Sequence, residues 1–97
     1  MKTNHLTLMK GLFSAKDALD ILMNAFARKI QFHEMKNFSA IVREGKEDAH
    51  SLQRIEELQK CKETILEIIK EAEKNESLID ILTEVRITVK EHSKILD

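Results

Sequence analysis

The chain has no proline and only two glycines, Gly11 and Gly45, in its 97 residues. These two residue types interrupt helices most strongly, so their scarcity favours long α-helices. Tryptophan and tyrosine are also absent. The sequence contains no glycine-rich loop to cradle a phosphate and no Gly-x-Ser-x-Gly turn to expose a serine nucleophile. We therefore expect a helical protein that is not an enzyme and needs no cofactor.

An excess of charge of one sign is also missing. The 16 basic and 17 acidic residues are interspersed and leave a net charge of −1. Nucleic acid is therefore not an expected partner. No window approaches 18 apolar residues, which argues against a membrane span or a membrane partner. The single cysteine, Cys61, has no partner for an intramolecular disulfide, and this is typical of a reducing compartment, so we expect a cytoplasmic protein.

The length of the chain predicts one domain, residues 1–97. Hydrophobic residues make up 42% of the sequence and charged residues 34%, a balance that suits folded helices with solvated outer faces. A domain of this size buries only roughly 60 to 65% of the surface of its unfolded chain. Its core is therefore thin, and self-association would add to its stability.

Local signals predict two consecutive long helices. Ser14, three residues before Asp17, resembles an N-cap that opens an apolar-periodic stretch. Gly45 is suited to the left-handed conformation that ends a helix. These signals predict one helix over 15–44 and the next over 46–75, joined as an antiparallel hairpin. The alternative is a single rod that runs through Gly45, because one glycine costs a helix only about 1 kcal/mol.

A third long helix is predicted over 77–97, where Ser77 stands three residues before Asp80 and apolar residues recur at steps of three and four. A short helix is predicted over 4–10, ended by Gly11. The expected fold class is therefore all-α, an antiparallel up-down-up bundle of three long helices with a short N-terminal helix.

One layer of this helical bundle has the residue types of a metal site. Drawn antiparallel, the three long helices bring His33, Cys61 and His92 within roughly one turn of each other. Thiolate and imidazole are good zinc ligands. A histidine on a bundle face more often bonds to a neighbour, so the preferred interpretation is that no metal binds, with these three residues as the alternative.

The segment Ala49-His50-Ser51-Leu52-Gln53-Arg54 resembles the phosphorylated-histidine motif of histidine phosphotransfer domains. That resemblance implies a helical bundle of about this size with His50 as the phosphoryl acceptor. The sequence departs from the motif at Gln53 and Arg54, which stand where the family has lysine and glycine.

The favoured function is a protein–protein interaction module. Exposed aromatic and methionine side chains are typical of surfaces that bind a helix. We expect the chain to form a homodimer, or to bind a partner helix, through helix faces. A small adaptor or secretion-type chaperone that shields an amphipathic client helix is the alternative. The predicted interface consists of Leu8, Met9, Leu12, Phe13, Phe32 and Met35.

Overall fold

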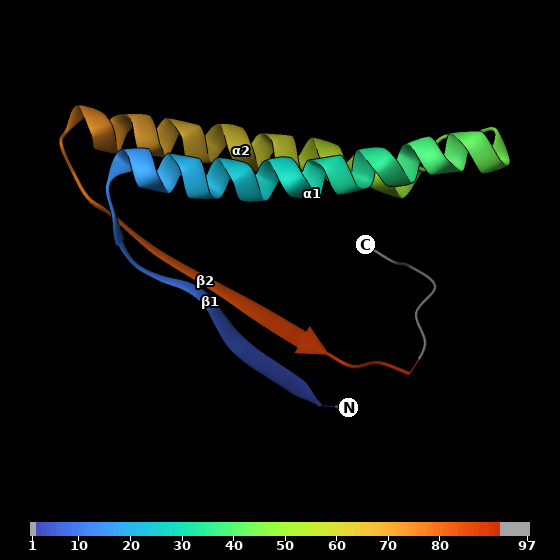
Figure 1. The fold of residues 1–97 in the computed structure, drawn as a ribbon, viewed down its shortest axis with the longest axis horizontal. Coiled ribbons are helices and arrows are strands. Elements are labelled where there is room, and N and C mark those ends of the chain that lie inside the picture. Colours follow the sequence, from blue (N-terminus) through green and yellow to red (C-terminus); the bar gives the residue numbers. More distant parts are fainter. Residues whose placement is uncertain (1, 92–97) are drawn as a thin grey trace.

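The computed structural model describes residues 2–91 and contains two helices and two strands. In chain order they are β1 (Thr3–Phe13), α1 (Ala15–Glu44), α2 (Ala49–Lys74) and β2 (Ile79–Thr88). Figure 1 shows α1 and α2 packed side by side as a hairpin, and β1 and β2 paired as a ribbon that leaves one end of it. The predicted all-α bundle of three long helices is therefore wrong.

The first long helix was predicted correctly. Helix α1 covers Ala15–Glu44, and the Asp17 backbone N–H donates to the Ser14 side-chain oxygen at 3.1 Å. Gly45 ends the helix in the left-handed conformation, with φ 73°. Both signals act within a few residues of the chain, which is why the sequence alone revealed them.

Helix α2 is shorter than the predicted 46–75. It begins at Ala49 because Asp48, and not Gly45, precedes the first helical residue and caps it. The antiparallel hairpin is confirmed, and the single rod is wrong because residues 45–48 form a turn between the helices. At the other end, the Ser77 backbone N–H donates to the Ala72 carbonyl at 2.8 Å. Ser77 thus closes α2 and does not begin a third helix.

The predicted helices over 4–10 and 77–97 are wrong, because these segments form the ribbon. Residues 92–97 of the second one lie outside the described residues. Isoleucine, valine and threonine favour strands because of their branched Cβ atoms. In β2 they occupy every second position: Ile79, Ile81, Thr83, Val85 and Ile87. The leucines at 78 and 82 and the valines at 85 and 89 also fit a helical repeat, so the two periodicities competed.

The two strands pair antiparallel, from Thr3 opposite Thr88 to Phe13 opposite Ile79. The register shifts between Thr7 and Met9, which places one extra residue, Leu8, in β1. A bulge of this kind reverses the alternation of side chains between the two faces. As a result, Leu6 and Met9 lie on the same face of the ribbon, although they are three residues apart.

The core lies where the ribbon meets the helical hairpin. Its buried residues come from α1 (Ala15 and Ala18), α2 (Ile69) and β2 (Ile81). The inner face of the ribbon supplies half-buried neighbours, which are Met9, Phe13 and Ile79, and the helices add Leu19, Leu22 and Ile65. Burial of these side chains from four elements holds the ribbon on the hairpin.

Candidate functional site

The far half of the ribbon is an uncovered apolar surface. Beyond the core, Leu6 is 56% exposed, and Val89, just past the end of β2, is 67% exposed. Figure 1 shows that the ribbon diverges from the helices, so the end of the ribbon near the N-terminus lies away from them. An isolated two-stranded ribbon is marginally stable in water. This part of the chain therefore stands to gain from a further layer or strand.

A second uncovered surface follows α1 toward the turn. Met35 is 60% and Phe38 61% exposed, and Phe32 and Val42 are exposed beside them. The spacing of three and four residues gathers these side chains on one face of the helix. The ammonium groups of two lysines lie 4.6 and 5.7 Å from the Phe32 ring centre. We call Phe32, Met35, Phe38 and Val42 the α1 stripe.

The six predicted interface residues do not form one groove. Leu8 and Leu12 are exposed on the ribbon, whereas Met9 and Phe13 pack against the core. Phe32 and Met35 lie on the α1 stripe, and Phe32 is about 25 Å along the helix from its start. The surface divides because residues 3–13 form a strand and do not fold along α1 as a short helix.

Sequence reasoning missed two parts of the exposed apolar surface. Phe38 is exposed because no third helix covers α1 within residues 2–91, although a third long helix was predicted. The segment that forms β2 lies within the helix that was predicted over 77–97. The alternating β-branched residues from Ile79 to Ile87 were the signal that would have identified it.

A buried polar network joins the helices near their turn. His33 and Ser51 are both fully buried, and His33 Nδ1 lies 3.4 Å from Ser51 Oγ. The Ser51 hydroxyl donates to Asp48 Oδ2 at 2.9 Å, and the Asp48 N–H donates to Asn37 Oδ1 at 2.7 Å. Ser51 is shielded from solvent and donates to a carboxylate, so it is not arranged as a nucleophile. The network fixes the register of α1 against α2.

Asp48 gives this network a dependence on pH. The hydrogen bond from the Ser51 hydroxyl holds the pKa of Asp48 below its usual value of 3.8, with smaller contributions from the Ser51 and His50 backbone and from Lys36. A lowered pKa in the folded state means that the stabilisation is complete well above pH 3.8 and is lost as the pH falls through the folded-state pKa.

We therefore expect the Asp48→Asn variant to have a melting temperature that falls less steeply in acid than that of the wild-type chain. Asparagine keeps the capping oxygen, so the two proteins should differ little near neutrality. Thermal unfolding followed by circular dichroism from about pH 6 to pH 2.5 measures this. Ser51→Ala removes the main cause of the lowered pKa and should flatten the acid limb too. Identical acid limbs for all three proteins would contradict the assignment.

The histidine phosphotransfer resemblance implied a helical bundle, and that implication is wrong. His50 lies in the first turn of α2, is half-buried, and has its ring 6.4 Å from the His33 ring in an edge-to-face arrangement. It packs beside the buried network at the base of the turn.

The alternative metal trio is not brought together in the described residues. His33 is buried, whereas Cys61 is exposed ten residues beyond Ser51, or about 15 Å along α2. His92 lies outside the described residues. Within residues 2–91, no group of three or more His, Cys, Asp or Glu side chains is placed to hold a metal ion.

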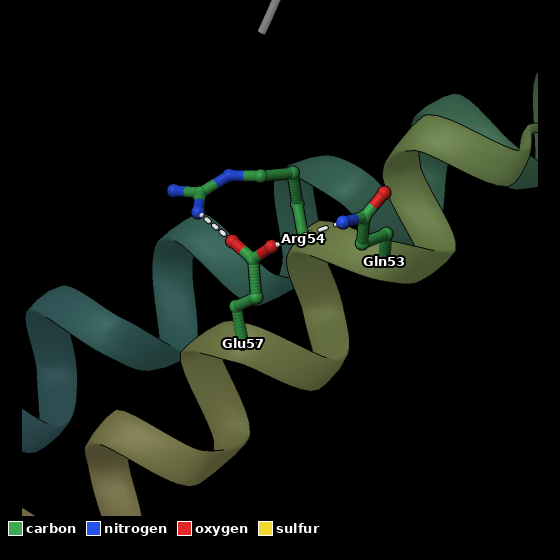
Figure 2. A network of polar contacts seen from close by, with 3 residues as sticks. All are labelled: Gln53, Arg54 and Glu57. Atoms are coloured by element: carbon green, nitrogen blue, oxygen red, sulfur yellow. Dashed lines mark hydrogen bonds and ion pairs between the residues drawn. The ribbon is translucent and has the colours of Figure 1, made fainter.

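The outer face of α2 carries pairs of opposite charge. Figure 2 shows the Glu57 carboxylate accepting hydrogen bonds from Gln53 and Arg54, both on the preceding turn. Lys60 and Glu56 form an exposed ion pair at 3.3 Å. Exposed pairs of this kind contribute at most about 1 kcal/mol each. They keep this face solvated and do not form a reactive site.

The comparisons leave the site to be interpreted from its own geometry. No protein family model, curated protein or solved structure matches this chain. Neither helix within residues 2–91 is both long and apolar enough to cross a membrane.

Proposed function

We propose that this chain is a non-enzymatic protein–protein interaction module that forms a homodimer. The observation that carries the proposal is the large surface of the folded chain. Its accessible surface is 7961 Å², whereas a compact monomer of 11.3 kDa exposes roughly 5,700 Å². Its extents of 50 × 34 × 14 Å describe a flat, elongated molecule. Association with a second copy would bury part of this excess.

The composition of the exposed surface supports the same proposal. Leucine, isoleucine, valine, methionine and phenylalanine side chains are exposed along the ribbon and along α1. Contiguous exposed apolar surface marks contact sites for other proteins. The buried apolar residues of residues 2–91 are few: Ala15, Ala18, Ile30, Ile69 and Ile81. A core of this size favours further burial in an assembly.

Native mass spectrometry and light scattering over a range of concentrations test the proposal. We expect twice the mass of the chain at micromolar concentration, and dissociation to a single chain on dilution. A single chain at every concentration would contradict self-association.

The α1 stripe supports a second candidate, an adaptor or secretion-type chaperone that binds an amphipathic helix. A stripe at helical spacing fits the apolar face of another helix. Replacing Met35 and Phe38 by Glu separates the two uses of this surface. A dimer that survives both substitutions leaves the α1 stripe available to another partner, whereas loss of the dimer places self-association on the helix face.

A further inference from the structure

The outer edge of β2 is free to pair with another strand. The Val89 backbone N–H donates to the Lys2 carbonyl, so the odd-numbered residues of β2 direct their backbone groups toward β1. The even-numbered residues direct theirs to the outer edge. Within residues 2–91 the sheet has only two strands, so no strand covers this edge. An unpaired edge of this kind is a template for an added strand.

The two edges of the ribbon differ in how well they are protected. The bulge at Leu8 interrupts β1, which carries Lys10 and follows directly after Lys2. Bulges and lysines are devices that prevent an edge from pairing. By contrast, β2 has no bulge, proline or glycine and is rich in β-branched residues. The edge prepared for pairing is therefore that of β2.

Building on the proposed self-association, we propose that two copies of this chain pair through their β2 edges, antiparallel, about a two-fold axis at Val85. The argument rests on charge complementarity. On the outer face of the ribbon, β2 and the residue after Val89 carry four exposed charges: Asp80, Glu84, Arg86 and Lys90. A two-fold axis at Val85 places Glu84 opposite the partner's Arg86 and Asp80 opposite the partner's Lys90. Symmetry repeats both pairs, so each of these four charges meets its opposite.

Neighbouring registers match fewer of these four charges. An axis at Glu84 sets Glu84 directly opposite the partner's Glu84. An axis at Thr83 pairs Arg86 with the partner's Asp80 but sets Glu84 opposite the partner's Leu82. An axis at Ile87 pairs Glu84 with the partner's Lys90 but sets Arg86 opposite the partner's Thr88, so only the axis at Val85 matches all four charges. The axis at Val85 also agrees with the backbone, because Glu84 and Arg86 are even-numbered and direct their hydrogen-bonding groups outward.

The same register covers the apolar inner face. Val85 meets the partner's Val85, and Ile87 meets the partner's Thr83. Val89, exposed in the single chain, meets the partner's Ile81, which is part of the buried core. The uncovered far end of each ribbon thus lies beside the packed near end of the other. The product is a four-stranded sheet in the order β1-β2-β2-β1, with both helical hairpins on one face.

Charge exchange at Glu84 and Arg86 tests this pairing. E84R and R86E each place like charges opposite one another twice per dimer, so we expect each to raise the dimer dissociation constant about tenfold or more. The double variant E84R/R86E restores opposite charges and should recover dimerisation. Mixing the two single variants should give a heterodimer, because one chain supplies only cations at the facing positions and the other only anions. Native mass spectrometry resolves the heterodimer by mass.

The exposed pair of Glu56 and Lys60 on α2 supplies the matched controls, E56R and K60E, which should dimerise as the wild-type chain does. A wild-type dimer that tolerates both single exchanges would overturn the β2 pairing and leave self-association standing. The same conclusion follows if the single exchanges weaken the dimer but neither the double variant nor the mixture recovers it. A wild-type chain that is monomeric throughout would overturn the proposed function itself.

Discussion

Replacing Ala18 by Glu is expected to remove a large part of the free energy of unfolding of the protein. Ala18 has an exposed fraction of 0% and packs with Ile69 and Ile81 where the ribbon meets the hairpin. A carboxylate introduced there loses its hydration, and within residues 2–91 no cation is placed in the core to pair with it. An uncompensated buried charge costs about 3 to 5 kcal/mol. The whole free energy of unfolding of a small domain is about 5 to 15 kcal/mol.

Ala27→Glu is the matched control, because Ala27 lies on the same helix and is exposed. Circular dichroism and urea denaturation should show wild-type stability for Ala27→Glu and a much lower midpoint of unfolding for Ala18→Glu. Equal stability of the two variants would mean that the ribbon does not cover α1 at Ala18.

Replacing Ile69 by Ala is expected to lower the free energy of unfolding by about 2 to 4 kcal/mol. Ile69 is 3% exposed and is the residue through which α2 enters the core beside Ala18 and Ile81. Removal of its side chain leaves a cavity that the small residues of α1 do not fill. The cost therefore includes both lost burial and lost packing contacts.

Ile68→Ala is the matched control, because Ile68 is the neighbouring residue and lies at the surface. It is 58% exposed, so Ile68→Ala should change the free energy of unfolding by no more than about 0.5 kcal/mol. Urea unfolding of both variants must be compared at one protein concentration, because association shifts the apparent stability. A larger effect for Ile68→Ala than for Ile69→Ala would mean that the inward face of α2 is misassigned.

The limits of the two helices show which parts of the fold were predictable from the sequence. Helix α1 was recovered with its exact limits because Ser14 and Gly45 act on backbone groups within four residues of themselves. The beginning of α2 was misplaced by three residues, because Asp48 caps the helix through Ser51 while Asn37 on α1 accepts the Asp48 N–H. The second contact joins residues that only the hairpin brings together.

The ribbon was not predicted because its pairing partners are far apart in the chain. The hydroxyl groups of Thr3 and Thr88 lie 2.9 Å apart across 85 positions of sequence. The bulge at Leu8 also interrupts the alternation of side chains between the two faces of β1, so residues 3–13 lack the regular period of a strand. For β2 the leucine and valine spacing satisfied a helix as well as a strand, so the choice depended on β1 lying beside it.

The amino-acid sequence by itself determined the helical hairpin, because caps, glycine and apolar spacing specify helices through contacts between near neighbours. It also placed exposed aromatic and methionine side chains, Phe32 and Met35, on a surface suited to contact. Only the tertiary structure decided that residues 3–13 and 79–88 are strands, since each needs the other to satisfy its backbone hydrogen bonds. That pairing also decided which residues meet in the core and left the charged edge of β2 open.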